Sequence, residues 1–466
     1  MKKLLLASLS LTVFFGACKD KKDDTTTPTT PTGNVVELTG DISANQTLTS
    51  DKKYLLKGFV YVKEGVTLTV QPGTVIMGEK SSKGTLVVSR GGKLMAEGTA
   101  SQPIVFTSAQ SANARREGDW GGIILLGKAP INPAGGEAKI EGGLTATAGG
   151  DEKKYIYYGG TDANDNSGSL KYLRIEFAGV AYSPDNEING LTMGGVGAGT
   201  KISYVQVYRS GDDAFEWFGG TVNCDHLVAT YTWDDDFDTD FGFSGKIQFG
   251  VAQRVKNTAD VSGSNGFESD NDANGSTNNP QTKAMFSNMT IIGAIATKGN
   301  SGINANFQNG AQIRRNSSES IMNSLLVGYP VGLYIDDTKG TATSGNMVAG
   351  SLMFKNNIIA GCTIPFKATL NDTNPTAWAA LVTATNTTVL EESPMAGVAD
   401  AYKFAPAVST PTGRPSFLLT SSSPALTGAD FTGTTGFQSV SYRGAFDGTN
   451  DWTTGWTTWA AEATEY

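Results

Sequence analysis

The sequence predicts an all-β protein whose chain winds into one parallel β-helix, and three observations support this fold class. Short runs of β-prone residues recur along the chain, and Gly, Asn, Asp or Ser follows each run closely. No stretch carries an apolar face long enough for a helix of three turns. Residues 212–216 match residues 234–238 at an offset of 22, and self-similarity at a fixed period indicates a repeat architecture.

The repeat is defined by one apolar position in each coil. Phe215 and Phe237 align at the offset of 22, and the slot can be followed in both directions. Its further members are expected at Leu191, Phe267, Ile303 and Leu333, which gives successive steps of 24, 22, 30, 36 and 30 residues. A base period near 22 with insertions suits coils that each bury one residue while loops absorb the extra length. A β-sandwich would show turn signals about every 8–12 residues, and these are sparse here.

Residues 1–17 are predicted to be a secretory signal peptide. Lys2 and Lys3 give it a positive start, an apolar run covers residues 4–15, and small residues precede Cys18. The run is too short to cross a bilayer. The ending Phe-Gly-Ala-Cys resembles a bacterial lipoprotein signal, which makes Cys18 the expected lipidated residue. Ordinary cleavage nearby, with Cys18 incidental, is the alternative.

The rest of the chain divides into three segments. Residues 18–34 are charged and then rich in Thr and Pro, so they cannot bury apolar surface and are expected to form a tether. Residues 35–430 hold the repeats and form the predicted β-helix with its loop insertions. Residues 431–466 are expected to cap the open end, as solenoids require, through Trp452, Trp456 and Trp459.

The composition excludes several classes of function. The chain has 57 Gly, 36 basic and 45 acidic residues, and its net charge of −9 argues against a nucleic-acid partner. His226 is the only His, so His-rich metal centres are excluded, and a packed or hydrogen-bonded role is expected for it. Cys224 and Cys362 lack the spacing of a disulfide framework and are expected as buried thiols, although pairing stays open. The sequence has no second apolar stretch of about 20 residues, which speaks against transport through a bilayer.

Several motifs resemble those of a known family. Residues 68–76, 90–99 and 103–107 look like the opening of right-handed parallel β-helix proteins, and residues 119–123, 233–240, 442–446 and 451–456 extend the match. Together they are similar to a Bacteroidota family of pectate-lyase-like β-helix lipoproteins, over nearly the whole mature chain. The resemblance implies a right-handed solenoid exported to the outer membrane and exposed at the cell surface. It implies no assigned activity, because fold does not determine function.

Acidic side chains concentrate between residues 212 and 272, where thirteen acids face three bases. If the Phe residues of the slot point inward, strand alternation turns their acidic neighbours outward on adjacent coils, and Asp236 is expected to face outward as well. Unit charges about 5 Å apart repel by roughly 3 kcal/mol at an effective dielectric near 20, so such a column requires cations. Oxygen ligands without His or Cys favour Ca²⁺ before Mg²⁺. The predicted ligands are Asp212, Asp213, Glu216, Asp234, Asp235, Asp236, Asp238, Asp240, Glu268, Asp270 and Asp272.

A second calcium signal lies in residues 270–275, which begin like a calcium loop but place Gln281 at the twelfth position. Without flanking helices this favours a generic calcium loop, and residues 162–168 give a weaker hint of the same kind. The alternative is that solenoid corners use Asp and Asn for turn hydrogen bonds, which leaves a merely solvated acidic face.

Two classes of function follow from the acidic face. The first, which we favour, is a non-catalytic surface protein that binds a glycan or a partner protein, with its oligomeric state open. Trp217 and Trp233 are the candidates to stack on sugar rings, and filling of the core is the alternative for both.

The second class is an enzyme acting on acidic glycans. Resemblance to pectate-lyase-like enzymes implies a calcium-dependent lyase in which Lys246 or Arg209 removes a proton; a solvated Lys and a surface Arg are the alternatives. A glycoside hydrolase would use paired carboxylates, for which Asp212, Asp213 and Asp235 are similar to the Gly-Asp-Asp feature of β-helix glycosidases. Neither family's full motif is present.

Overall fold

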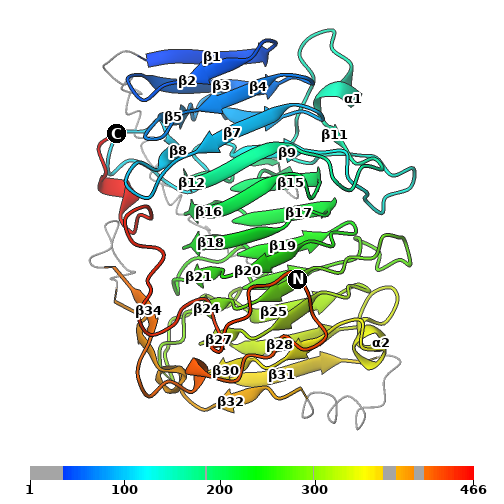
Figure 1. Cartoon of the computed structure of the whole chain (residues 1–466), viewed down its shortest axis with the longest axis vertical. Coiled ribbons are helices and arrows are strands. Elements are labelled where there is room, and N and C mark those ends of the chain that lie inside the picture. Colours follow the sequence, from blue (N-terminus) through cyan, green and yellow to red (C-terminus); the bar gives the residue numbers. More distant parts are fainter. Residues whose placement is uncertain (1–34, 184–185, 298, 371–384, 404–413) are drawn as a thin grey trace, which may run out of the picture.

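The chain forms one column of stacked parallel coils (Figure 1). The computed structural model describes residues 35–183, 186–297, 299–370, 385–403 and 414–466. The predicted signal peptide, Cys18 and the tether lie outside the described residues. Strands on successive coils pair in parallel and form three long sheets, which confirms the predicted all-β parallel β-helix.

The first sheet contains strands from nearly every coil. Its members are β1 (Val35–Ile42), β3 (Lys53–Val62), β5 (Val75–Gly78), β8 (Ile104–Ser108), β12 (Gly168–Glu176), β16 (Lys201–Tyr208), β18 (Cys224–Thr230), β21 (Val251–Gln253), β24 (Thr290–Ile292), β27 (Leu325–Val327), β30 (Ile358–Ala360) and β32 (Thr388–Leu390).

The second sheet carries the acidic residues and is called the flank sheet below. After the C-terminal halves of β1 and β3 it contains β6 (Thr85–Val88), β9 (Ile123–Leu126), β15 (Leu191–Val196), β17 (Phe215–Gly220), β19 (Phe237–Asp240), β22 (Phe267–Ser269), β25 (Asn309–Arg314), β28 (Val331–Asp336) and β31 (Ile364–Thr369).

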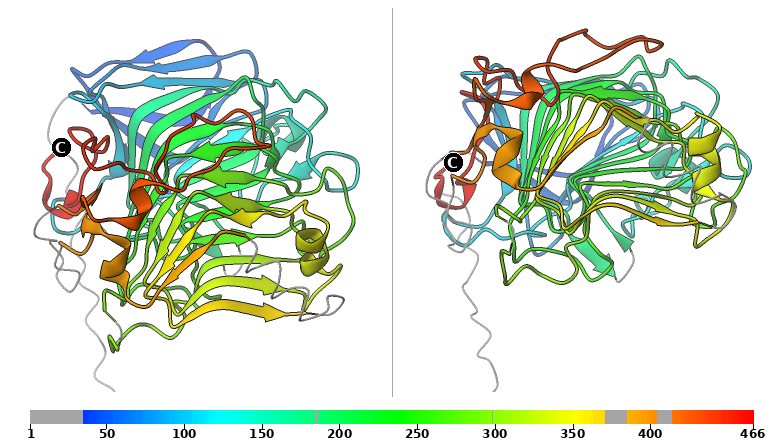
Figure 2. Two further views of the ribbon diagram at one scale, coloured as in Figure 1. Left: turned by 60° about the horizontal axis from the view of Figure 1, so that its bottom comes forward. Right: turned by 90° about the horizontal axis from the view of Figure 1, so that it is seen from below.

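The third sheet closes the coil (Figure 2). It contains β2 (Gln46–Leu48), β4 (Thr67–Val70), β7 (Lys93–Glu97), the N-terminal halves of β12, β16 and β18, and then β20 (Lys246–Gln248), β23 (Met285–Ser287), β26 (Ser320–Met322) and β29 (Phe354–Lys355).

The remaining elements are short and lie outside the coils. They are the pairs β10 (Ala138–Lys139) with β11 (Tyr157–Tyr158), β13 (Ala181–Ser183) with β14 (Asn186–Glu187) and β33 (Val398–Asp400) with β34 (Ser416–Leu419), the helices α1 (Glu152–Tyr155) and α2 (Thr343–Val348), and the 3₁₀ turns η1 (Ser393–Ala396), η2 (Pro424–Leu426) and η3 (Ala461–Ala463). Within the described ranges, no helix has the length and apolarity that a bilayer crossing requires.

One residue per coil bends the chain sharply where the third sheet meets the first. Eight such residues have positive φ values between 47° and 62°, namely Tyr172, Tyr204, His226, Phe249, Asn288, Asn323, Asn356 and Asn386. Asn adopts this left-handed conformation readily, whereas aromatic residues do so rarely. The aromatic members stack on one another, with ring centroids 4.5 Å apart for Tyr172–Tyr204 and 4.2 Å apart for Tyr204–His226, and this stacking offsets the strain. His226 is therefore packed, as predicted, and its Nδ1 lies 2.5 Å from Asp225 Oδ1.

The apolar slot runs down the inside of the flank sheet with one correction. Leu191, Phe215, Phe237 and Phe267 pair on successive strands and are fully buried. The next member is Ala311 and not Ile303, so the last two steps are 44 and 22 residues. The prediction was wrong because Gly302-Ile303 resembles the true pair Gly310-Ala311, whose small side chain carried too little hydrophobic signal.

The C-terminal segment does not cap the end of the solenoid, and that prediction was wrong. Residues 430–466 run along its side from the last coils back to the first (Figure 1). The segment contacts one coil after another: Asp430 N donates to Asn323, Gln438 N to Gln248 and Thr458 N to Gln206, each at 2.8–2.9 Å. Trp456 lies against the rings of Tyr172 and Tyr204. The Trp residues therefore cover the aromatic corner column, which would otherwise expose rings to water.

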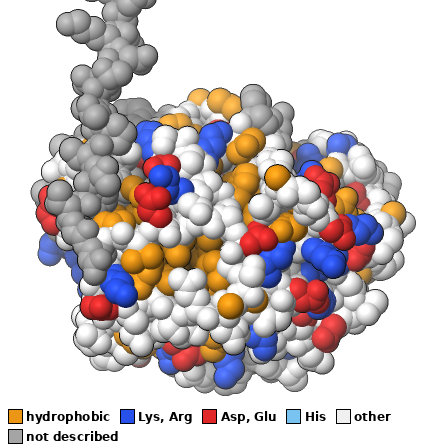
Figure 3. Space-filling view, turned by 90° about the horizontal axis from the view of Figure 1, so that it is seen from above, with side chains coloured by type: hydrophobic (Ala, Val, Ile, Leu, Met, Phe, Trp, Pro, Cys, Tyr) orange, Lys and Arg blue, Asp and Glu red, His pale blue; other side chains and the backbone are white. Residues whose placement is uncertain are grey.

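The end of the column formed by the first coil presents apolar side chains with acidic and basic ones around them (Figure 3).

Cys224 and Cys362 are both free thiols, and Cys224 is buried. The expectation of a buried thiol is therefore confirmed for Cys224, whereas Cys362 is half-buried.

A buried carboxyl group lies inside the column, directly behind the flank sheet. Glu319 has no exposed surface, and its Oε2 accepts a hydrogen bond of 2.8 Å from Thr239 Oγ1. Thr239 and Ser317 hydroxyls both lie within 2.7 Å of the Ser269 hydroxyl, so the group is surrounded by neutral oxygens. Burial raises the pKa of Glu319 to about 8.

Replacing Glu319 by Gln is expected to flatten the dependence of stability on pH. Because the folded pKa lies above the ordinary Glu value of 4.5, the folded state holds a proton between these two pH values that the unfolded state has lost. Glu319 therefore contributes stability below about pH 4.5 that is lost as the pH rises to about 8, at no more than about 1.4 kcal/mol per pH unit. Denaturant unfolding in calcium-free buffer at pH 5 and pH 8 measures the difference. The exposed Glu465→Gln variant is the control, and equal slopes in both variants would contradict the assignment.

Candidate functional site

The outer face of the flank sheet carries one acidic side chain on each of three adjacent strands. Glu216 on β17 pairs with Asp238 on β19, which pairs with Glu268 on β22. Their Phe neighbours in the slot point into the core. Neighbouring strands lie about 4.8 Å apart, so the predicted outward column is confirmed in register.

A second column lies in the turn just before these strands, two positions ahead of the apolar slot. Its five members are Asn189, Asp213, Asp235, Asn265 and Asn309. The backbone joins them in one repeating pattern, because the amide after each member donates to the carbonyl of the next. Four such bonds of 2.9–3.2 Å link Gly190 to Asp213, Ala214 to Asp235, Asp236 to Asn265 and Gly266 to Asn309.

The side chains of this Asx column also bond from coil to coil. Asp213 Oδ1 accepts from Asp235 N at 2.7 Å, Asp235 Oδ1 accepts from Asn265 N at 2.5 Å, and Asn265 Oδ1 accepts from Asn309 Nδ2 at 2.7 Å. An Asn side chain oxygen can make every one of these bonds. The structure of the turn therefore requires an oxygen at Asp213 and Asp235, but it does not require a negative charge.

The Asn side chains of the column also donate hydrogen bonds, which an ionised Asp cannot do. Asn265 Nδ2 donates to Glu268 at 3.1 Å, Asn309 Nδ2 donates to Gln312 at 3.2 Å, and Asn189 Nδ2 donates to Glu216. In the two central coils a carboxylate, which has no donor when ionised, stands where the other coils provide an amide. The centre of the column is therefore the place where negative charge accumulates without structural need.

The two columns, together with Asp212 and Asp234 from the same turns, bring carboxylate oxygens together in three overlapping groups. They are Asp212 with Asp213 and Asp234, Asp213 with Glu216 and Asp238, and Asp235 with Asp238 and Glu268, and within each group the ligand oxygens lie within 4.8 Å of one another. Asp213 and Asp238 are each shared by two groups, so the row is continuous. We call these residues the carboxylate row.

Burial and mutual repulsion raise the pKa of the row. Burial is the largest cause for Asp213, Glu216, Asp235 and Asp238, whose pKa values lie well above the ordinary range, and neighbouring carboxylates raise them further. The same causes raise the pKa of Glu268 to about 8, although Arg314 opposes the shift. Members of the row therefore keep their protons to a higher pH than free carboxyl groups do, unless a cation replaces the protons.

Glu141 joins the row from a distant part of the chain, and sequence analysis missed it. It lies in the insertion between β9 and β12, where Gly142 N and Gly143 N donate to Asn186 Oδ1 at 2.7 and 3.2 Å. Burial raises the pKa of Glu141 to about 7, while hydrogen bonds with Glu216 and Asn189 lower it. No pattern in the insertion marks this residue, because only the folding of the loop over the flank sheet brings it there.

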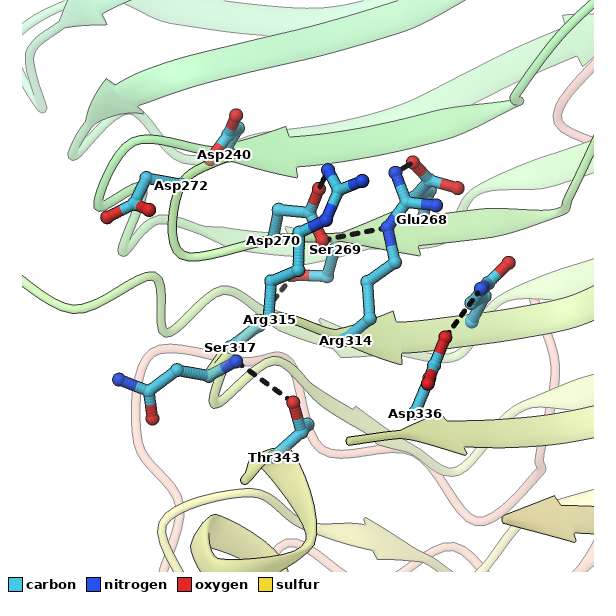
Figure 4. Close-up of polar contacts among 12 residues, drawn as sticks. Asp240, Glu268, Ser269, Asp270, Asp272, Arg314, Arg315, Ser317, Asp336 and Thr343 are labelled. Carbon is cyan, nitrogen blue, oxygen red and sulfur yellow. Dashed lines mark hydrogen bonds and ion pairs between the residues drawn. The ribbon is translucent and has the colours of Figure 1, made fainter. Parts of the chain in front are cut away.

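The lower end of the row is neutralised by the protein itself (Figure 4). Arg314, at the end of β25, forms ion pairs with Glu268 and with Asp270, the latter at 2.9 Å between Nε and Oδ1. Arg315 Nη1 lies 2.5 Å from Asp270 Oδ2. Among the described residues, no Lys or Arg forms an ion pair with Asp212, Asp213, Glu216, Asp234, Asp235 or Asp238. The upper part of the row therefore has no such charge partner among the described residues.

Replacing Arg314 by Met is expected to enlarge the response to calcium. The variant leaves Glu268 and Asp270 without their main cation, which is expected to cost about 2 kcal/mol of stability in calcium-free buffer. Calcium should recover more stability in this variant than in the parent protein. Thermal melting with chelator and with millimolar Ca²⁺ makes the comparison. Lys403→Met removes the exposed pair with Asp400 and serves as the control; a chelator midpoint as high as that of the parent would contradict the expectation.

A hard divalent cation fits these donors. Calcium takes six to eight oxygen ligands at about 2.3–2.6 Å, so two oxygens on one ion lie no more than about 5 Å apart. The three groups meet this limit. Three carboxylates do not fill the coordination shell, and Asp212, Asp234 and Asp238 remain partly exposed. Water or a ligand oxygen can therefore complete it.

Comparison with known proteins identifies the fold family. The family model of the pectate-lyase-like β-helix domain matches residues 40–401. The chain belongs to this family. No curated protein matches it. Among solved structures, a Family 28 exopolygalacturonase from Yersinia enterocolitica is 13% identical, over 77% of this chain and 71% of that chain, with a TM-score of 0.19. At this identity and score the likeness bears on neither activity nor substrate.

In this β-helix, Asp236 does not face outward, and its placement among the ligands was wrong. It is fully buried, and Oδ2 lies 3.0 Å from Arg254 Nε. Alternation back from Phe237 would turn Asp236 outward and Asp235 inward. Both residues lie in the turn before β19, where strand alternation does not apply, and Asp235 takes the outward place in the Asx column.

The two segments that resemble calcium loops, residues 270–275 and 162–168, are turns stabilised by their own hydrogen bonds. Asp272 Oδ1 accepts from Asn274 N at 2.8 Å and from Ser276 N at 3.2 Å. In the weaker loop, Asp162 Oδ1 accepts from Asn164 N at 3.0 Å. Asp240 Oδ1 likewise accepts from Phe241 N at 2.6 Å. The oxygens of Asp240 and Asp272 act as turn acceptors, and those of Asp270 pair with Arg314 and Arg315. None of the three residues belongs to the three groups.

The two candidate bases of a lyase lie away from the row. Lys246 Nζ donates to Thr435 O in the C-terminal segment at 2.6 Å. Arg209 lies at the start of the turn between β16 and β17, where it pairs with Glu117 at 2.5 Å and with Glu462. Both predictions followed from proximity in sequence, and each side chain is held by a partner outside the row.

The two Trp candidates have separate outcomes. Trp217 is fully buried and its ring lies 5.3 Å from that of Phe243, so it is a core residue and cannot stack on a ligand. Trp233 is 40% exposed and directly precedes Asp234. It stays a candidate contact residue.

Proposed function

We propose that this protein binds glycans through calcium held on the carboxylate row. One observation carries the proposal. Asp213 and Asp235 occupy positions of the Asx column that Asn fills in the neighbouring coils, and an Asn side-chain oxygen can accept the backbone hydrogen bonds that each of them accepts. A pair of buried carboxylates that the turn does not need is costly, since like charges about 5 Å apart repel by roughly 3 kcal/mol at an effective dielectric near 20.

Calcium accounts for this cost better than any group of the protein. The ligands are oxygens alone, and the described ion pairs leave the upper row without a cation. An ion that bridges Asp213, Glu216 and Asp238 removes the repulsion and keeps open positions toward solvent. Those positions suit hydroxyl or carboxylate oxygens of a sugar.

The exposed ring of Trp233 supports a glycan as the ligand. Sugar rings stack on aromatic faces, and Trp233 lies next to a ligand residue of the first group. The family, named for its pectate-lyase-like β-helix, agrees with a glycan-related role.

The decisive experiment has two steps. Calorimetric titration with Ca²⁺ is expected to show saturable binding that Asp213→Asn removes. Immobilised neutral and uronic-acid polysaccharides are then tested for retention of the protein with calcium and with chelator. Retention that needs calcium and is reduced in Trp233→Ala supports the proposal. Absence of calcium uptake up to millimolar concentration overturns it, and calcium uptake without retention on any glycan directs the search to a protein partner.

A glycoside hydrolase is the second candidate, and one observation favours it. Carboxyl groups of Asp213, Glu216 and Asp238 lie within 4.8 Å of one another, and Glu141 beside them has a pKa raised to about 7 by burial. A protonated acid next to an ionised carboxylate is the arrangement that glycoside hydrolysis uses. Release of reducing ends from the retained polysaccharides, lost in Asp213→Asn, would establish it. The lyase alternative is not supported by the two bases expected from the sequence, because Lys246 and Arg209 are held by partners outside the row.

We also propose that the protein is exported and anchored in the outer membrane through a lipid on Cys18. The support is the sequence of residues 1–18 alone. When cells that produce the protein are grown with a labelled fatty-acid analogue, the parent protein is expected to carry the label and the Cys18→Ser variant is expected to lack it. Labelling of both would overturn the anchor.

A further inference from the structure

Arg254 and Asp236 form an ion pair inside the column, behind the carboxylate row. Arg254 is 1% exposed and Asp236 is fully buried. Arg254 Nε lies 3.0 Å from Asp236 Oδ2. Charged residues are almost never buried so completely unless they are paired, and the position of this pair calls for an explanation.

The guanidinium group also binds backbone carbonyls on both sides of the pair. Arg254 Nη1 donates to Thr232 O at 2.7 Å, and Nη2 donates to the carbonyls of Asp234 and Asn265. Asp236 adds two backbone bonds, since its N–H donates to Asn265 O at 3.2 Å and its carbonyl accepts from Phe215 N at 3.3 Å. The pair thus fixes the turn of residues 232–236 and ties it to the coils above and below.

The carbonyl of Asp234 belongs to the peptide that joins Asp234 to Asp235. These two residues supply oxygens to the first and third groups of the carboxylate row. Holding the plane of that peptide sets the directions in which the two side chains leave the backbone. Each residue then presents its carboxylate to a different group.

Stability alone does not account for a buried ion pair. The cost of removing two charges from water is about as large as their attraction, and an apolar pair of similar volume is often as stable or more so. Side chains behind a metal site commonly act by orienting the ligands. We propose that the Arg254–Asp236 pair positions Asp234 and Asp235 for the cation, an inference that rests on the proposed function.

The first test removes the pair while keeping its volume. Arg254→Met combined with Asp236→Leu is compared with the parent protein by calcium calorimetry and by melting in chelator. The expected result is a melting midpoint close to that of the parent and an affinity for calcium lower by about 10–100-fold. An affinity equal to that of the parent overturns the inference.

Two single variants decide the matter if the double variant does not fold. Asp236→Asn keeps an oxygen for Arg254 but removes the charge, and a positioning residue should then change calcium affinity by less than about threefold. Arg254→Lys keeps the charge but cannot reach three carbonyls at once, so its affinity should fall clearly. If Asp236→Asn weakens binding as much as Asp213→Asn does, Asp236 is itself a ligand and the inference is wrong.

The parent protein separates this inference from the proposed function. No uptake of calcium by the parent overturns both. Uptake by the parent with unchanged affinity in the double variant overturns the positioning role alone.

Discussion

Replacing Asp213 and Asp235 together by Asn is expected to raise the unfolding midpoint in calcium-free buffer and to remove the response to calcium. Both positions belong to a column whose other members are Asn189, Asn265 and Asn309, and an Asn side-chain oxygen can accept the same backbone hydrogen bonds that Asp213 and Asp235 accept. The variant therefore keeps every oxygen that accepts a backbone hydrogen bond, and it adds two amide donors beside Glu216 and Asp238.

The expected gain in chelator is several kcal/mol, since each removed neighbour contributes about 3 kcal/mol of repulsion at an effective dielectric near 20. Unfolding entropy of about 2.1 cal/mol/K per residue converts this to a few degrees for a chain of this length. Calcium then has no site, so the midpoint should be the same with and without it.

Scanning calorimetry of the parent and the variant, each with chelator and with Ca²⁺, gives the four midpoints needed. Asp400→Asn, an exposed residue of β33, controls for the loss of net charge. Asn265→Asp is the converse change, and it should lower the chelator midpoint by extending the row. A double variant that melts below the parent in chelator would show that the two charges serve the fold itself.

In calcium-free buffer the parent protein is expected to lose stability as the pH rises from about 4 to about 8. The folded pKa values of the row lie above the unfolded ones, with Asp234 raised to about 6 and Glu268 to about 8, and burial is the first cause of both shifts. The folded state therefore binds more protons than the unfolded state across this window. Stability is fully present below the unfolded pKa values and is lost as the pH passes through the folded ones.

Calcium should abolish most of this slope above about pH 6, because the bound ion takes the place of the protons. Each group contributes at most about 1.4 kcal/mol per pH unit, so the sum over the row is several kcal/mol. Urea unfolding at pH 5, 6, 7 and 8, with chelator and with Ca²⁺, gives the two profiles. Parallel profiles, or a chelator profile that rises with pH, would show that the row ionises freely and holds no ion.

The repeat could be predicted from the sequence because its signal is local. The offset of 22 between residues 212–216 and 234–238 fixed the strand register that pairs Glu216 with Asp238. Strand alternation then placed one acid per coil on the outer face. The prediction of the apolar slot was wrong only at Ala311. There a small side chain fills the inner position, and an insertion changes the number of residues between successive members.

The outward column of acids was predicted from the sequence, but the Asx column in the turns before it was not. Asp213 and Asp235 were found as acids, but their place in a column with Asn189, Asn265 and Asn309 depends on turns that only the stacked coils define. Asp236 was misplaced because a turn residue does not follow the alternation of a strand.

The parallel β-helix and the excess of acids on three coils could be predicted from the sequence alone. A repeat and a local excess of acids depend only on the order of residues along the chain, so both can be recognised from the sequence. The three-dimensional structure was needed to show which acids meet and that Arg314 neutralises the lower end. It was also needed to place Glu141 beside Glu216 and the Arg254–Asp236 pair behind the row. These contacts join residues from different coils or from an insertion, and side-chain direction at a coil corner depends on backbone bonds that stacking alone creates.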